Sequence, residues 1–298
     1  MTELTGYLAP EGFVAELQTE LGGACETHHR LLLAPGPERP VAWAANVWRD
    51  PVRMEIASIG DAAKKLRAIQ RNWALYSCAQ HRRAALIAEN LPKVSAKPLR
   101  FGDGAPTAPL GSWTLLDKDT LLASPHCSSP FPNGEVHFVE DRAAPPSRAY
   151  LKLWELFTVL GRQPVRGDFC LDLGSSPGGW TWVLQQLGAR VLSVDKAPLD
   201  PRIADLPDIE HRRESAFALD PSAAGRVDWL FSDVVCYPGR LLTLVNKWIA
   251  AKTVRSFVCT IKFQGAADFS IIQQFAAIPG SRLLHLHHNK HELTWIKL

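Results

Sequence analysis

Residues 169–180 read FCLDLGSSPGGW, and this stretch decides the fold of the C-terminal half of the chain. Its apolar run ends with Asp172 and Leu173, as expected for a buried β-strand, and Gly174, Gly178 and Gly179 predict a tight turn after it. The residues that follow, 178–187, predict a helix. A strand, a glycine-rich turn and a helix N-terminus can bind a nucleotide-like cofactor, because glycine lets the backbone turn sharply and lie close to a ligand.

Short apolar strands alternate with helices from about residue 146 onward. The predicted strands are residues 169–173, 191–194, 210–213, 227–232 and 257–261, and the predicted helices are 148–160, 178–187, 240–250 and 266–276. This alternation predicts a doubly wound α/β fold with a parallel sheet. Residues 282–287 and 293–297 flank a turn, so we expect a terminal hairpin that adds an antiparallel last strand.

The residues of the glycine turn distinguish between two kinds of cofactor. Asp195 ends the next strand, 21 residues after Gly174, where an acid can bind a ribose hydroxyl of either kind. A dinucleotide-binding turn needs a glycine where this chain has Ser176, so that the pyrophosphate can lie against the backbone. The pattern therefore favours S-adenosylmethionine over a nicotinamide dinucleotide, and over a turn that binds no ligand.

Residues 172–180, DLGSSPGGW, resemble the first motif of the FtsJ-like RNA 2′-O-ribose methyltransferases, D-L-G-x-x-P-G-G-[WF]. The resemblance implies a Rossmann-like class I methyltransferase domain over residues 146–298, with a seven-stranded sheet whose last strand is antiparallel. It also implies that the chain is an enzyme that uses S-adenosyl-L-methionine.

The resemblance further implies a catalytic tetrad of Lys, Asp, Lys and Glu, drawn from four separate places in the fold. The matching residues are Lys152 in the helix before the motif, Asp233 after the fourth strand, Lys262 at the end of the fifth strand, and Glu292 before the last strand. Each residue alone has an ordinary structural explanation. Their joint occurrence in the expected order supports the family's chemistry.

A ribose 2′-hydroxyl is a weak acid and must lose its proton to become a good nucleophile. A lysine is protonated at neutral pH, and a second cation nearby favours its neutral form. Our hypothesis is that Lys262 is the base and that Lys152 lowers the pKa of Lys262 and stabilises the developing oxyanion. Asp233 would orient Lys262 and lie near the sulfonium, and Glu292 would hold Lys152 or the ribose.

The cofactor residues are predicted by the same resemblance. Asp172 and the turn are expected to hold the methionine portion and Asp195 the ribose, whereas Ser215 stands where the family often has an adenine-binding acid, with Glu214 one position earlier. Trp180 is expected to be a core residue, although it could pack on the cofactor. The predicted set is Asp172, Gly174, Ser175, Ser176, Pro177, Gly178, Gly179, Trp180, Asp195, Glu214, Ser215 and Asp233.

Residues 144–148, 193–198 and 228–235 resemble the RlmM-type large-subunit ribosomal RNA cytidine 2′-O-methyltransferases within that family. This resemblance implies ribosomal RNA as the substrate and an RNA-binding region before the methyltransferase domain. Residues 1–145 are then expected to be a smaller α+β RNA-binding region that is at most partly THUMP-like. Transfer RNA or a messenger RNA cap remains an alternative substrate, and a non-catalytic cofactor- or RNA-binding module would predict a damaged tetrad.

The N-terminal region is predicted from weaker local patterns. We expect helices at 11–21, 61–69 and 79–90, and strands at 30–33, 41–47, 112–116, 120–124 and 135–139. Residues 61–100 hold nine basic side chains against two acidic ones, which indicates either an RNA contact or an ordinary solvated helix surface. Trp73, Tyr76 and His81 could stack on bases, but a place in the core is favoured for these aromatic residues.

The composition limits the number of domains and the class of protein. The 298 residues are 46% hydrophobic and 21% charged, which is typical of a globular chain of about two domains. No apolar run is long enough to span a bilayer, and the first residues lack the pattern of a signal peptide. The six cysteines form no C-x-x-C pair, so we expect reduced thiols in a cytoplasmic protein and no zinc site. We also expect a monomer.

Overall fold

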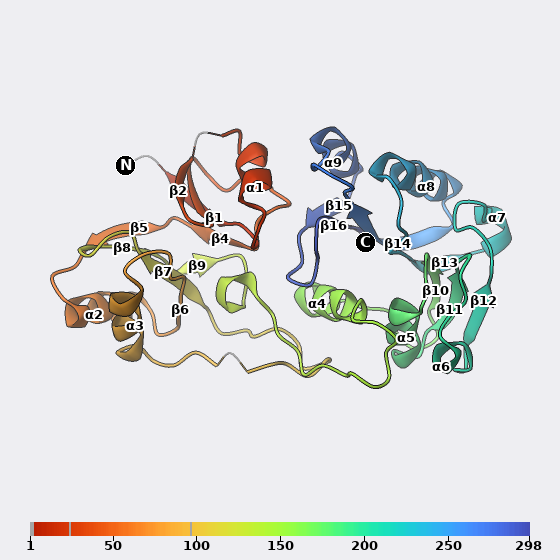
Figure 1. The fold of residues 1–298 in the computed structure, drawn as a ribbon, viewed down its shortest axis with the longest axis horizontal. Helices are drawn as coiled ribbons and strands as arrows, with labels where there is room; N and C mark the ends of the chain where they lie inside the picture. The colour runs from red at the N-terminus through yellow and green to blue at the C-terminus, as the bar shows by residue number, and fades with distance from the viewer. Residues whose placement is uncertain (1–2, 24, 96) are drawn as a thin grey trace. The chain divides into compact units, whose positions relative to one another are not determined.

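The computed structural model describes residues 3–23, 25–95 and 97–298. The chain forms two compact units, Met1–Phe138 and Val139–Leu298 (Figure 1). The sequence placed the division at residues 145 and 146, so Pro145 and Pro146 lie inside the second unit. No helix among the described residues is long and apolar enough to cross a bilayer.

The second unit is built on a seven-stranded sheet with the order β12-β11-β10-β13-β14-β16-β15. Its strands are β10 (Phe169–Leu173), β11 (Arg190–Val194), β12 (Ile209–Arg212), β13 (Val227–Ser232), β14 (Val254–Lys262), β15 (Ser281–Leu284) and β16 (Glu292–Lys297). The first five are parallel, and β16 runs antiparallel to both β14 and β15. The predicted Rossmann-like fold of a class I methyltransferase is therefore confirmed.

Helices cover the sheet on both faces, as parallel strands require. They are α4 (Tyr150–Leu160), α5 (Gly179–Gln186), α6 (Pro201–Ala204), α7 (Pro221–Ala224), α8 (Pro238–Ala251) and α9 (Phe269–Ala276). In Figure 1, α4 and α5 lie on one side of the sheet, and α8 and α9 lie on the other. The sheet is apolar on both faces, and its central strands bury residues such as Leu171, Phe231 and Val258 completely.

The strand order reverses direction at β10, which has β11 on one side and β13 on the other. In open α/β sheets, ligands bind beyond the carboxyl ends of the strands at such a reversal. The ends of β10 and β13 carry Asp172 and Asp233, so the topology brings two of the predicted site residues to that edge.

The first unit is an α+β region with two sheets. One sheet has the order β2 (Glu26–His28), β3 (Leu31–Pro35), β1 (Leu4–Leu8), β4 (Asn46–Arg49) and β9 (His126–Cys127). The other has the order β5 (Val52–Glu55), β8 (Thr120–Ser124), β7 (Gly111–Leu115) and β6 (Trp73–Leu75). Its helices are α1 (Val14–Glu20), α2 (Ile59–Ile69) and α3 (His81–Glu89), and η1 (Pro132–Gly134) is a short 3-10 turn.

Three expectations for the first unit are wrong. Residues 41–45 of the expected strand 41–47 lie outside β4, which begins at Asn46, and His81, which the sequence favours as a core residue, is exposed. Residues 135–139 do not form a strand, and the sheet-like pairing that the described part of the chain gives them is an isolated bridge between Leu99 and Phe138. Asn133 and Gly134 before them have positive φ angles of 56° and 79°, which interrupt an extended chain. Trp73 and Tyr76 are buried in the core, as favoured, so neither presents a free ring to a base.

Candidate functional site

The structure brings Lys152, Asp233, Lys262 and Glu292 together in the second unit. The Lys152 Nζ atom lies 3.0 Å from Asp233 Oδ1 and 2.7 Å from Glu292 Oε1. The Lys262 Nζ atom lies 3.1 Å from the same Asp233 oxygen and donates a 2.6 Å hydrogen bond to the Asp233 backbone oxygen. The four side chains thus form one continuous cluster with Asp233 between the two lysines.

Sheet topology explains this convergence. The strands β13 and β14 are parallel neighbours, so Asp233 and Lys262 emerge at the same edge of the sheet. The antiparallel pairing of β14 with β16 places Glu292 directly opposite Lys262. Lys152 reaches the cluster from α4, a helix that precedes the sheet in the chain.

The two lysines have different electrostatic surroundings. The Lys152 side chain is only 12% exposed, and burial by itself would lower its pKa. The charges of Asp233 and Glu292, and their hydrogen bonds, outweigh that effect and raise the pKa of Lys152 above its usual value. Lys152 is therefore held as a cation at neutral pH. The amine of Lys262 is ion-paired with one carboxylate among the described residues, that of Asp233, and donates to the backbone oxygen of the same residue.

The glycine turn between β10 and α5 packs closely against the rest of the domain. Gly174 has a φ angle of 79°, and a Cβ atom there would lie 2.6 Å from the Cα atom of Val234. A Cβ atom on Gly179 would lie 2.8 Å from Ser147 Oγ. These two glycines are needed because the turn touches neighbouring protein segments, and not only because a ligand must approach.

Three carboxylates line the edge of the sheet at the turn: Asp195 after β11, Asp172 on β10 and Asp233 after β13. Asp172 is fully buried, Thr181 donates a 2.7 Å hydrogen bond to its Oδ2, and its Oδ1 atom has no hydrogen-bond partner in the described residues. Burial raises the pKa of Asp172 to about 7, and the nearby charges of Asp233 and Asp195 add to the rise.

This edge suits a cationic ligand. A sulfonium or ammonium group would relieve the repulsion among the three carboxylates and would lower the pKa of Asp172, whereas a pyrophosphate would be repelled. Asp195 accepts hydrogen bonds from the backbone N–H groups of Ser176 and Ala197, and a carboxylate has further acceptor sites that ribose hydroxyls can use. The residues present therefore fit S-adenosylmethionine better than a dinucleotide.

Other predicted cofactor residues are tied to the protein itself. Ser175 is buried and its Oγ lies 2.6 Å from Ser193 Oγ, while Ser176 Oγ donates to the Pro198 backbone oxygen. Gly178 and Pro177 belong to the same turn, and a Cβ atom on Gly178 would lie 3.0 Å from Ile203. These contacts hold the shape of the turn.

Trp180 and the adenine candidates have different positions. Trp180 is buried and donates from its indole to the Ala149 backbone oxygen at 3.0 Å, so it is a core residue. The Lys152 Nζ atom lies 6.0 Å from the centre of its ring. Glu214 and Ser215 follow β12, where Ser215 Oγ accepts from the Phe217 backbone at 3.3 Å. The adenine contact stays a prediction.

Sequence reasoning missed Glu155, which lies one helical turn after Lys152 on α4. Its side chain is buried and accepts hydrogen bonds from the backbone N–H groups of His287 at 2.6 Å and His288 at 2.9 Å. Its carboxylate also pairs with His288 Nδ1 at 2.6 Å. These contacts fasten the loop that leads into Glu292 to the helix that carries Lys152. The available signal was a lone acid on an otherwise apolar stretch of helix.

Replacing Glu155 by alanine is expected to lower the free energy of unfolding by about 3 kcal/mol, because two backbone N–H groups and the His288 ring lose their buried acceptor. The loop before Glu292 should also loosen, which would weaken the Lys152–Glu292 pair. Urea unfolding monitored by tryptophan fluorescence measures the effect. Glu210→Ala, at an exposed position on β12, is the matched control. Equal stability of the two variants would contradict the anchoring role of Glu155.

Among the described residues, no group of three or more His, Cys, Asp or Glu side chains is arranged to hold a metal ion.

Comparison with known proteins gives consistent results for the second unit. Residues 145–264 match the model of the family described as FtsJ-like methyltransferase. Proteins named Ribosomal RNA large subunit methyltransferase M are similar to this chain: the one from Halorhodospira halophila is 34% identical over 157 residues, covering 50% of this chain and 46% of that protein. The one from Marinobacter nauticus is 32% identical over 200 residues, covering 60% of this chain and 55% of that protein.

A third such protein, from Laribacter hongkongensis, is 36% identical over 147 residues, covering 47% of this chain and 41% of that protein. The chain therefore spans about half the length of the curated relatives that it matches. The resemblance that residues 172–180 predicted is confirmed by these matches.

Proposed function

We propose that this chain, whose residues 145–264 are an FtsJ-like methyltransferase domain, transfers a methyl group from S-adenosylmethionine to a ribose 2′-hydroxyl of RNA. The observation that carries the proposal is the convergence of Lys152, Asp233, Lys262 and Glu292 beside the glycine turn. Two lysines around one carboxylate are suited to moving a proton from a weakly acidic hydroxyl and to stabilising the negative charge that results.

S-adenosylmethionine, when bound, supplies an electrophilic methyl group on a positively charged sulfur. We assign its methionine portion to Asp172 and the turn 174–180, and its ribose to Asp195. The carboxylate of Asp233 belongs both to this edge and to the tetrad. It is thus suited to fix the position of the cationic part of the cofactor relative to the two lysines.

The roles of the two lysines follow from their partners. Lys152 is paired with two carboxylates and keeps its proton, so it acts as a fixed positive charge beside the developing 2′-oxyanion. Lys262 has one carboxylate partner, and we assign it as the base that accepts the hydroxyl proton in its neutral form. Glu292 holds Lys152, and Asp233 holds the Lys262 amine in place.

The substrate we propose is large-subunit ribosomal RNA, with a cytidine as the modified nucleotide. The support is the name shared by the curated relatives and the resemblance of residues 144–148, 193–198 and 228–235 to that type. A transfer RNA or a messenger RNA cap is the alternative. A non-catalytic binding module is disfavoured because the four tetrad residues are present and in contact. The cytoplasmic location and the monomeric state stay predictions.

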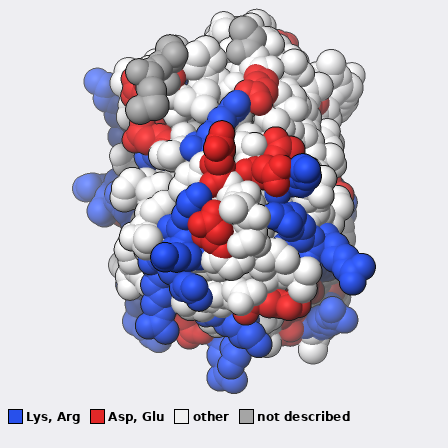
Figure 2. Space-filling view, turned by 90° about the vertical axis from the view of Figure 1, so that its left-hand side faces the viewer, with Lys and Arg blue, Asp and Glu red and all other residues white. Residues whose placement is uncertain are grey.

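The first unit supplies a basic surface for the RNA. Most basic side chains of residues 61–100 are exposed, on α2, on α3 and in the segment that follows α3. Figure 2 shows Lys and Arg side chains over much of the lower part of the face turned to the viewer. Exposed cations of this kind bind phosphates without regard to sequence.

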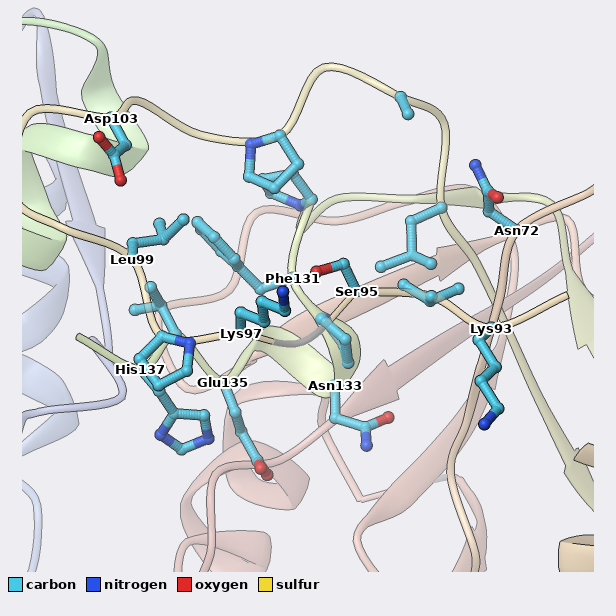
Figure 3. A pocket seen from close by; sticks show the side chains of 18 of the residues that line it. Asn72, Lys93, Ser95, Lys97, Leu99, Asp103, Phe131, Asn133, Glu135 and His137 are labelled. Atoms are coloured by element: carbon cyan, nitrogen blue, oxygen red, sulfur yellow. The ribbon is translucent and has the colours of Figure 1, made fainter. Parts of the chain in front are cut away.

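Lys93 and Lys97 also line a pocket of about 560 Å³ in the first unit. Its walls come from Asn72 and from residues within 93–95, 97–99, 103–110 and 130–137, and they include five prolines and the ring of Phe131. Figure 3 shows the two lysines among these walls. The pocket's Glu135 is paired with Arg30 at 3.1 Å, so its negative charge is partly compensated. The pocket therefore offers cations beside an apolar surface, a combination that suits unpaired RNA.

The function is tested by incubating the protein with labelled S-adenosylmethionine and ribosomal RNA transcribed in vitro, which carries no modifications. Labelled RNA with one alkali-resistant linkage at a cytidine is expected, because a 2′-O-methyl group blocks cleavage at that ribose. Label on a base would overturn the 2′-hydroxyl assignment. Cofactor binding without transfer to any RNA pool would favour the non-catalytic module.

Reversing both pocket charges, Lys93→Glu with Lys97→Glu, is expected to weaken RNA binding. The slope of log affinity against log salt concentration should fall by about 0.7 for each phosphate contact that is lost. Filter binding at several salt concentrations measures it. Lys118→Glu, an exposed lysine of the same unit, is the matched control. An unchanged slope in the double variant would remove these two lysines from the RNA surface.

A further inference from the structure

The segment that follows Asp233, residues 234–237, carries two large exposed apolar side chains. Val235 is 75% exposed, and Tyr237 is 69% exposed. Cys236 between them is buried. Two large side chains are therefore open to a ligand close to the tetrad.

This segment is held at both ends. At its start, Lys262 Nζ donates to the Asp233 backbone oxygen at 2.6 Å. At its end, the Tyr237 backbone oxygen accepts from the N–H groups of Arg240 and Leu241, and Pro238 begins α8. The residue before a proline is restricted to extended conformations, and Tyr237 has φ −64° and ψ 143°. Val235 and Tyr237 are exposed on either side of the buried Cys236, where the chain bends.

Arg240 adds a cation in the first turn of α8. Its guanidinium carbon lies 3.9 Å from the centre of the Phe217 ring, so the ring supports its flat face. Arg240 is exposed, and no carboxylate among the described residues forms an ion pair with it. A guanidinium held in this way keeps its N–H groups available for a phosphate.

We propose that Val235, Tyr237 and Arg240 form a stacking platform, on which the RNA places the nucleobase of the methylated nucleotide or of its neighbour. Tyr237 stacks on the base, Val235 packs against its edge, and Arg240 binds the adjacent phosphate. This inference rests on the proposed function, because it takes RNA as the ligand of the tetrad.

Reach and chemistry both favour RNA as the occupant. An extended chain advances about 3.3–3.6 Å per residue, so Val235 lies within about 7 Å of Asp233 and Tyr237 within about 14 Å along the backbone. A ribose at the tetrad therefore brings its own base or the next one to this segment. Unpaired bases are commonly bound by stacking on aromatic rings beside a cation.

The platform is tested with Tyr237→Ala, Tyr237→Phe and Tyr237→Trp, and with Val165→Ala as the control for loss of an exposed apolar side chain in the same unit. Tyr237→Ala is expected to raise the KM for RNA about tenfold or more, with the affinity for S-adenosylmethionine and the thermal unfolding temperature unchanged. The phenylalanine and tryptophan variants should keep a KM near that of the wild type, because stacking needs the ring and not the hydroxyl.

Three outcomes would overturn the platform: a KM in Tyr237→Ala equal to that of the control, a loss confined to kcat, or an equal loss in Tyr237→Phe. If the wild-type protein transfers no methyl group, the proposed function fails independently. Direct binding of fluorescent single-stranded RNA then decides the platform, and equal affinity of the wild type and Tyr237→Ala would reject it.

Discussion

Lys262→Met is expected to reduce methyl transfer to RNA by at least about 100-fold while the affinity for S-adenosylmethionine stays within about twofold. Methionine keeps much of the length and apolar volume of lysine but has no amine to accept the hydroxyl proton. The Lys262 amine contacts Asp233, and the turn 174–180 is held by other partners, so cofactor binding should survive. Single-turnover transfer and calorimetric titration of the cofactor give the two quantities.

Arginine variants separate the roles of the two lysines. An arginine keeps its positive charge at every accessible pH and cannot act as a base. Lys262→Arg should therefore be as inactive as Lys262→Met, whereas Lys152→Arg should retain measurable transfer because Lys152 acts as a cation. Lys290→Met, on the exposed hairpin loop, controls for loss of a lysine near the site. Substantial turnover by Lys262→Arg would show that Lys262 acts through its charge alone.

Gly174→Ala is the second substitution with a large expected effect, and it should impair both folding and transfer. The φ angle of 79° is unfavourable for alanine, and the new Cβ atom would lie 2.6 Å from the Val234 Cα atom. Val234 is next to Asp233, so any shift that relieves this overlap moves the tetrad. We expect the free energy of unfolding to fall by about 3 kcal/mol and cofactor affinity to fall with it.

Gly161→Ala is the matched control for this substitution. Gly161 also has a positive φ angle, 62°, but a Cβ atom there would have no neighbour within 4 Å, and the residue caps the far end of α4. Gly161→Ala should lower the free energy of unfolding only by the backbone strain, about 1 kcal/mol, and leave methyl transfer intact. If both variants lose the same stability and both remain active, the close contact between the turn and Val234 is not needed for methyl transfer.

Much of the second unit could be predicted from local patterns. Buried parallel strands are short continuous apolar runs, so the order of strands was predicted correctly from 169 to the terminal hairpin. The four-residue helices α6 and α7 were missed, because they are too short to show a helical periodicity. The first unit was harder, because strands such as β6, three residues long, exist only through pairing with a distant strand. Such pairing leaves little trace in the residues themselves.

The sequence by itself determined the doubly wound fold and the glycine turn at 174–179. It also identified the tetrad residues Lys152, Asp233, Lys262 and Glu292. Each of these features can be recognised from a short stretch of neighbouring residues. Only the tertiary structure decided that Lys152 has two carboxylate partners and Lys262 one. It also decided that Gly174 lies against Val234, and that Glu155 holds a loop more than 130 residues away. These are contacts between elements far apart in the chain. Their geometry depends on how the helices and strands pack, which no local pattern specifies.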